Sequence, residues 1–135
     1  LLRSEYRCAY APRAAGGDLR IATFSLGASH ACAVATDGGV WCWGPSPTGA
    51  LARPGAAADS VVRVPTRVAA PGRFSDVAVG DRFTCALAAD GTPWCWGRNA
   101  IPIGGRVPTV VGLLGTGRVE PVSPPLPVAG APPLV

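Results

Sequence analysis

One stretch of 18 residues occurs twice in this chain, and both copies end in Trp-Cys-Trp-Gly. The first copy covers residues 27–44 and the second, 53 positions further on, covers residues 80–97. Ten of the 18 aligned positions are identical, and they are Gly, Cys, Ala, Asp and Trp, residue types with strong geometric roles. Agreement of this kind at a fixed spacing is typical of a chain that stacks one structural unit on the next.

The residues that lead into each copy also match, and they read as strands. Residues 24–27 align with residues 77–80, and both stretches alternate apolar residues with small or polar ones, as a half-buried strand does. The 18 Gly and 15 Pro residues argue against helices, whereas a hydrophobic content of 48% argues against disorder outside the proline-rich parts. Each unit is therefore predicted to be strand, glycine turn, strand, Asp-Gly turn, strand and a long variable segment, in an all-β fold.

The Asp-Gly turn fixes which residues face each other across the hairpin. If residues 36–38 form a three-residue loop, Gly38 takes the left-handed position of a type I turn with a G1 bulge. Counting outward from residues 35 and 39 places Cys32 opposite Cys42, at a non-hydrogen-bonded site where Cα atoms lie about 4.5 Å apart. A disulfide can span that distance. The same count around residues 89–91 places Cys85 opposite Cys95.

Two disulfides, Cys32–Cys42 and Cys85–Cys95, are thus expected, and they would imply an oxidising compartment. The alternatives are reduced, buried cysteine pairs or a zinc site. Zinc is disfavoured because the sequence has no Cys-x-x-Cys spacing and His30 is its single histidine. The fifth cysteine, Cys8, is interpreted as having a partner upstream of Leu1, with a free thiol or an intermolecular bridge as alternatives.

Strand alternation assigns the hairpin residues to two faces. One face carries Cys32, Val34, Val40 and Cys42, and the other carries Ala33, Ala35, Trp41 and Trp43. Small alanines beside large indoles favour packing as the role of the tryptophans, with stacking on a ligand such as a sugar as the alternative. The candidate ligand contacts are Trp43, Trp96, Arg98 and Asn99. Pro93 replaces Val40 in the second copy, which predicts an edge strand or a bulge because proline has no amide donor.

The string Gly-x-x-His-x-Cys-Ala-Val-x-x-Asp-Gly-x-Val-Trp-Cys-Trp-Gly at residues 27–44 resembles the regulator of chromosome condensation repeat. Residues 80–97 match it at the same positions, with Phe83 in place of the histidine. Repeats of this family form the four-stranded blades of a β-propeller, so the resemblance implies that fold. Cysteines on both hairpin strands resemble the version found in exported bacterial members. The match is specific over residues 19–44 and 72–97 and weak beyond them.

The resemblance divides the chain into four segments. Residues 1–18 would be the remnant of an upstream blade, 19–71 repeat unit one, 72–123 repeat unit two, and 124–135 the start of a further unit or a tail. Two units and a fraction cannot close a propeller ring, because each repeat needs neighbours on both of its faces. Further blades or other copies of the chain are therefore expected to complete it.

Propellers of this family present loops to partner proteins, so the resemblance implies a non-enzymatic scaffold that binds a protein. The variable segments 45–71 and 98–120 would carry the specificity. The alternatives are a carbohydrate-binding module and a structural protomer of a surface assembly. The sequence contains no phosphate loop, nucleophile elbow or metal-ligand cluster, so neither enzymatic activity nor a cofactor or metal is expected.

Charge and hydropathy bear on partners and location. The net charge is +4, and the 12 cationic residues, all arginine, are spread singly from Arg3 to Arg118. A nucleic-acid site normally shows clustered cations with interleaved aromatics, so no nucleic acid is expected. No stretch reaches the roughly 18 to 20 apolar residues of a membrane-spanning helix, so no membrane is expected either. With the predicted disulfides, this indicates a secreted or cell-surface protein, with the periplasm as an alternative.

Overall fold

The computed structural model describes residues 18–45, 61–101, 110–117, 120 and 122–132, and all the regular structure in them is β-strand. The strands are β1 (Ile21–Leu26), β2 (Ala31–Ala35), β3 (Val40–Pro45), β4 (Val61–Arg67), β5 (Phe74–Val79), β6 (Phe83–Ala88), β7 (Pro93–Arg98), β8 (Ala100–Ile101), β9 (Val110–Val111) and β10 (Val122–Pro127). The all-β prediction is confirmed. These residues contain no helix that is long and apolar enough to cross a membrane.

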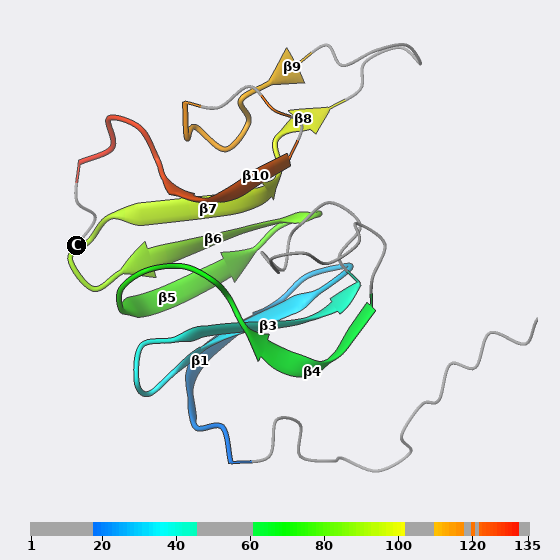
Figure 1. Cartoon of the computed structure of the whole chain (residues 1–135), viewed down its shortest axis with the longest axis vertical. Coiled ribbons are helices and arrows are strands. Elements are labelled where there is room, and N and C mark those ends of the chain that lie inside the picture. Colours follow the sequence, from blue (N-terminus) through cyan, green and yellow to red (C-terminus); the bar gives the residue numbers. More distant parts are fainter. Residues whose placement is uncertain (1–17, 46–60, 102–109, 118–119, 121, 133–135) are drawn as a thin grey trace, which may run out of the picture.

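Two four-stranded antiparallel sheets make up most of the fold. The first, blade 1, has the order β1-β2-β3-β4, and the second, blade 2, has the order β5-β6-β7-β10. Strands β8 and β9 follow β7 in the sequence and pair with each other. Strand β10 comes after them and pairs with β7. Figure 1 shows the two blades stacked face to face, with β8 and β9 at one end of blade 2. Blades of this kind are the units of a β-propeller.

The hairpin turns have the geometry that the Asp-Gly pairs predict. In blade 1 the Gly38 amide donates to the Ala35 carbonyl (2.9 Å) and the Ala35 amide to the Gly39 carbonyl (2.8 Å). Gly38 has a φ of 87°, a conformation that a residue with a Cβ rarely adopts. The carboxylate of Asp37 accepts the Gly39 amide at 2.8 Å and closes the turn. Blade 2 repeats these bonds around Gly91, so the register follows from the turn in both hairpins.

The core lies between the two blades. We call the side of a blade that carries its cysteines the Cys face and the opposite side the Trp face. The Cys face of blade 1 packs against the Trp face of blade 2, and β5 lies beside β1 and β2. The buried residues of this core are Cys32, Val34, Val40, Cys42, Val62, Val68, Phe74, Val77, Ala86 and Trp96. Because burial of one large aliphatic or aromatic side chain contributes roughly 1.5–3 kcal/mol, this layer fixes how the blades stack.

The expected boundary between residues 123 and 124 lies within β10, the outer strand of blade 2. One expectation about the second unit needs correction. Pro93 is neither on an edge strand nor at a bulge, because β7 lies between β6 and β10. Pro93 is instead the first residue of β7, where the missing amide is tolerated, and its carbonyl accepts the Val128 amide at 2.8 Å. Blade 1 has the same bond from Val68 to the carbonyl of Val40, also at 2.8 Å.

Several expectations fall on residues that the structure does not describe. The remnant of an upstream blade, residues 1–18, lies outside the described part except for Asp18, and Cys8 lies outside it entirely. Residues 46–60, 102–109 and 118–119 of the two variable segments are also outside it.

Candidate protein-interaction surface

The disulfide-bonded hairpins form the rigid part of each blade. The structure joins Cys32 to Cys42 and Cys85 to Cys95, with 4.1 Å between the Cα atoms in both pairs. The two bridges differ in their surroundings. Cys32 and Cys42 are fully covered by blade 2, whereas Cys85 is half-buried on the Cys face of blade 2 and lines two hollows. The second bridge is therefore the more accessible one.

His30 lies at the junction between the blades. It is buried, and its Nε2 shares a hydrogen bond of 2.7 Å with the hydroxyl of Thr84 in β6 of blade 2. Its Nδ1 is hydrogen-bonded to the hydroxyl of Ser29 at 3.1 Å. Burial lowers the pKa of His30, because it disfavours the charged imidazolium, and the negative charge of Asp81 opposes this in part. His30 therefore acts as a neutral polar link between the blades.

The four candidate ligand contacts are in very different positions. Trp96 and Asn99 are both 0% exposed, so neither offers surface to a ligand. Trp43 is half-buried and packs against the core. Arg98 is partly exposed, and its Nε donates to the Ala100 carbonyl at 2.8 Å. The burial of Trp96 argues for packing as its role and against stacking on a sugar.

Asn99 organises the segment that follows β7. Its side-chain amide donates to the Glu120 carbonyl (2.9 Å), and its side-chain oxygen accepts the Leu114 amide (3.1 Å). Its backbone carbonyl accepts the Gly112 amide at 2.9 Å. One buried side chain therefore holds the loop of residues 112–117 against the end of blade 2, while Leu113 in that loop stays exposed.

A hollow of about 260 Å³ lies between this loop and blade 2. Its walls are Asp81, Phe83, Cys85, Cys95, Arg98, Leu113 and Leu114. The lining combines an acidic and a basic side chain with aromatic and aliphatic ones. We call this site the loop-framed hollow.

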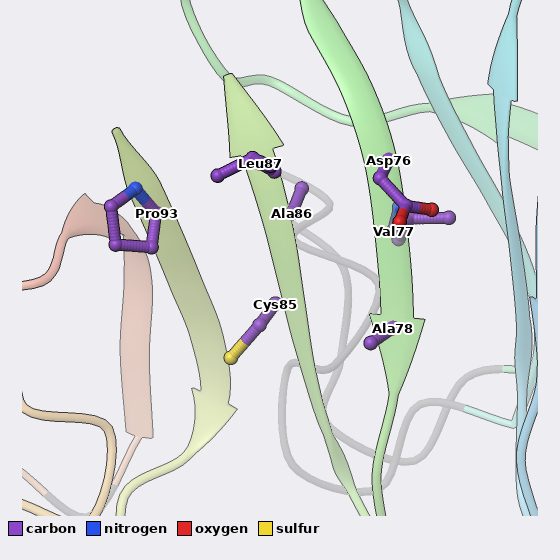
Figure 2. A pocket seen from close by; sticks show the side chains of 7 residues that line it. All are labelled: Asp76, Val77, Ala78, Cys85, Ala86, Leu87 and Pro93. Carbon is purple, nitrogen blue, oxygen red and sulfur yellow. The ribbon is translucent and has the colours of Figure 1, made fainter. Parts of the chain in front are cut away.

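A second, shallower hollow of about 170 Å³ lies along the Cys face of blade 2. Figure 2 shows it between β5, β6 and β7, with Leu87, Pro93 and Cys85 along β6 and β7 and Asp76, Val77 and Ala78 on β5. Apart from Asp76 the lining side chains are apolar. In blade 1 the equivalent positions of Cys85 and Leu87 are Cys32 and Val34, and both are buried by blade 2.

The sequence did not single out Phe83, Leu113 or Leu114 as lining a surface hollow. Phe83 could have been singled out from the sequence, because it occupies the position in the second copy that His30 occupies in the first. Leu113 and Leu114 lie in the weakly matching segment, where no repeat pattern marks them. Within the described residues, no three His, Cys, Asp or Glu side chains come together as a group that could hold a metal ion.

Comparison with protein families gives two matches, both to the regulator of chromosome condensation (RCC1) repeat. One covers residues 37–87 and the other residues 21–44. The longer match begins at the Asp-Gly turn of blade 1 and ends in β6, so it runs across the junction between the blades. No curated protein matches the chain at a significant level.

Similar folds occur among solved structures. Prp20p from Saccharomyces cerevisiae, described with its binding to Gsp1p and histones, is 19% identical with a TM-score of 0.68. Yeast RCC1 (Prp20) in a structure with Kap60 is 16% identical with a TM-score of 0.67. Human WBSCR16 is 22% identical with a TM-score of 0.59.

These similarities cover 87%, 87% and 84% of this chain but only 27%, 26% and 26% of the other chains. The chain therefore spans about a quarter of the length of the propellers that it resembles. The two repeat matches, the two four-stranded blades and the agreement in fold lead to the same conclusion: the chain belongs to the RCC1 repeat family of β-propeller proteins.

Proposed function

We propose that the chain is a non-catalytic protein-binding module and that the loop-framed hollow with Leu113 at its rim is the recognition surface. The observation that carries this proposal is the anchoring of the 112–117 loop by the buried Asn99. A loop fixed in this way presents its exposed side chain with little loss of conformational freedom on binding. Recognition by loops on a rigid scaffold is a common arrangement.

The composition of the surface fits a protein partner. Leu113 is exposed beside Arg98 and Asp81, which lie on the walls of the hollow. Protein interfaces combine an apolar centre with a polar rim, and arginine is enriched in them. Similar propellers support the proposal, since Prp20p is described with its binding to Gsp1p and histones and, in a second structure, as bound to Kap60.

We further propose that the module works in an oxidising compartment, as a secreted, cell-surface or periplasmic protein. The support is the presence of two disulfides that close equivalent hairpins. Structural disulfides persist outside the reducing cytosol and are rare within it.

The test is affinity capture with matched variants of the chain as bait, using the exported protein fraction of the source organism. Leu113→Asp places a charge on the proposed surface. Val64→Asp is the matched control, because Val64 is also an exposed aliphatic residue, on β4 of blade 1, at 65% exposed against 44% for Leu113. We expect a protein that binds the wild-type chain and Val64→Asp but is lost with Leu113→Asp.

The captured protein is then purified and titrated against the three baits by calorimetry. A hot-spot residue contributes 1–2 kcal/mol or more, so Leu113→Asp should raise the Kd by about tenfold or more. Equal affinity for Leu113→Asp and Val64→Asp would show that the loop-framed hollow is not the recognition surface.

A further inference from the structure

A third hollow, of about 370 Å³, lies in the junction between the two blades. Both blades contribute to its walls, which include Ala22, Val34, Thr36, Arg73, Phe74 and Ser75. We call it the inter-blade hollow. It lies beside the turn between β2 and β3, at the end of the blades away from β8 and β9 (Figure 1). The loop-framed hollow is at the other end of β6, so the two sites are separate.

Two β-bulges shape the inter-blade hollow. Ala22 is the unpaired residue within β1, and Ser75 is the unpaired residue within β5. They are 53 positions apart, so the two bulges occupy equivalent places in the repeat. A bulge bends its strand, and bulges occur frequently next to functional sites. The hollow therefore follows from the backbone of the repeat and not only from the size of the side chains around it.

Arg73 is the charged residue among the described walls of the hollow, and three contacts hold it in place. Its backbone carbonyl accepts the Ala89 amide at 2.8 Å, and its Nε donates to the Asp37 carbonyl at 3.1 Å. Its side chain lies against Gly38, where a Cβ would come within 2.8 Å of the Arg73 Cβ. Its terminal nitrogens, Nη1 and Nη2, make no hydrogen bond to the described residues. The guanidinium is thus fixed with two donors available.

The other walls suit a carboxylate on a short aliphatic stem. The hydroxyl of Thr36 makes no hydrogen bond to the described part of the chain, so it can donate to a ligand. Val34 and Phe74 are both buried and give the hollow an apolar floor. The terminal nitrogens of an arginine match the two oxygens of a carboxylate. This combination fits the side chain of a glutamate or an aspartate.

Two more arginines lie around the same turn, outside the hollow. The guanidinium of Arg67 lies against Gly39, where a Cβ would be 3.2 Å from the Arg67 Cζ and Nη2 atoms. The backbone carbonyl of Arg20 accepts the Thr36 amide at 2.9 Å. Both arginines are exposed. A chain with several carboxylates that crosses this turn would therefore meet three cations.

The acidic residues at this end of the blades are not in the hollow. Asp37 and Asp90 belong to the two hairpin turns, and each accepts a backbone amide of its own turn with Oδ1, at 2.8 and 2.9 Å. Asp18 precedes Arg20 in the sequence. Since none of the three lines the hollow, a carboxylate that enters it meets Arg73 without an acidic neighbour on the walls.

We propose that the inter-blade hollow binds a glutamate or aspartate side chain from an acidic peptide segment of another protein. The carboxylate accepts from Nη1 and Nη2 of Arg73 and from the Thr36 hydroxyl, and its stem lies on the apolar floor. Neighbouring carboxylates of the segment pair with Arg20 and Arg67. A peptide is favoured over a free small acid, because only a ligand with several carboxylates can use all three arginines. This inference does not rest on the proposed recognition surface.

The experiment measures the Kd of a capped, fluorescently labelled hexaglutamate peptide for the whole chain by fluorescence anisotropy. Arg73→Gln should raise the Kd by about tenfold or more, because it removes the charge-assisted hydrogen bonds. Arg63→Gln is the matched control, since Arg63 is also exposed and lies on β4 away from the turn. It removes the same charge and should change the Kd by less than about threefold, because salt screens distant charges. Equal effects of the two variants would overturn the proposal.

A second variant blocks the hollow and leaves the charge unchanged. Ala22 is exposed on β1, so Ala22→Phe is expected to fold and to place a ring in the hollow. With the circular dichroism spectrum of the wild type, it should also raise the Kd by about tenfold or more. If Ala22→Phe binds hexaglutamate as the wild type does, the peptide does not enter the hollow and the proposal is wrong.

The class of ligand is tested by competition. Hexaglutamine should not displace the labelled peptide, and glutarate should need about 100-fold more than unlabelled hexaglutamate, because it carries few of the charges. Displacement by glutarate at the same concentration would show a site for free small acids. Tighter binding of a single-stranded DNA oligonucleotide would show a nucleic-acid site. Either result would overturn the proposal.

Nuclear magnetic resonance locates the peptide on the ¹⁵N-labelled chain. Titration with hexaglutamate should shift the Nε–Hε signal of Arg73 and the amide signal of Gly38, and leave the Leu113 amide unchanged. Shifts confined to Leu113 and Leu114 would place the peptide at the loop-framed hollow and overturn the proposal. Failure of the inter-blade site is thereby distinguished from failure of the recognition surface at Leu113.

Discussion

Replacing Thr84 with Val tests the junction between the blades at a buried hydrogen bond between two side chains. The Thr84 hydroxyl and His30 Nε2 are 2.7 Å apart, and both residues are buried. Valine has nearly the shape of threonine, so the change removes the hydrogen bond and leaves no cavity. A buried group that loses its partner costs about 1–3 kcal/mol. We therefore expect Thr84→Val to lower the free energy of unfolding by about 2 kcal/mol.

The assay is urea unfolding followed by tryptophan fluorescence at one fixed protein concentration, since self-association would otherwise shift the midpoint. With an m-value of about 2 kcal/mol/M for a small protein, the midpoint should fall by about 1 M. Thr66→Val is the matched control, because the Thr66 hydroxyl bonds the Val64 carbonyl at an exposed site. That variant should stay within about 0.5 kcal/mol of the wild type.

A double-mutant cycle completes the test. Phenylalanine occupies the position equivalent to His30 in blade 2, so His30→Phe suits the local geometry. Removal of both partners of a buried hydrogen bond can be nearly neutral. The His30→Phe, Thr84→Val double variant should therefore be about 1–2 kcal/mol more stable than the sum of the single effects implies. Additive effects, or a Thr84→Val variant as stable as the wild type, would refute a buried link between the blades.

Three further outcomes follow from the same structure. Because burial lowers the pKa of His30, the unfolded state binds the extra proton as the pH falls below about 6.5, so unfolding titrations should show stability declining toward pH 5. His30→Phe should remove that slope, since the chain has no other histidine. Mild reductant with alkylation and mass mapping should open Cys85–Cys95 before Cys32–Cys42, because blade 2 covers the latter while Cys85 is half-buried; the reverse order would contradict the stacking. Trp96→Ala should cost about 3–5 kcal/mol as a fully buried indole, clearly more than Trp43→Ala in the same unfolding assay, and equal losses would count against the described core.

The sequence predicted the parts of the fold that depend on local geometry. The Asp37-Gly38 and Asp90-Gly91 turns determine the register of each hairpin, and the cysteines face each other because of that register alone. The two copies could also be aligned directly, which identified the repeating unit. These features need only contacts between residues close in sequence.

The rest depends on contacts between distant residues. Trp43 and Trp96 are identical in the repeat, and only the stacking of blade 2 on blade 1 buries one more than the other. Asn99 could not be recognised as an anchor, because two of its partners, Leu114 and Glu120, lie 15 and 21 residues away in a segment without a repeat pattern. Pro93 suggested an edge strand because it has no amide donor, and its sequence neighbours do not show that β10, which follows β8 and β9, pairs with β7.

The Cys face of blade 1 packs on the Trp face of blade 2, and nuclear Overhauser contacts in solution test this packing most directly. The packing predicts contacts from the Thr84 methyl group to the His30 ring, and from the Val79 methyl groups to the Gly27 Hα atoms. Contacts confined to pairs within each blade, such as residues 32 and 42 or 85 and 95, would show two folded blades that do not stack in this way. That result would contradict the packing of blade 1 on blade 2.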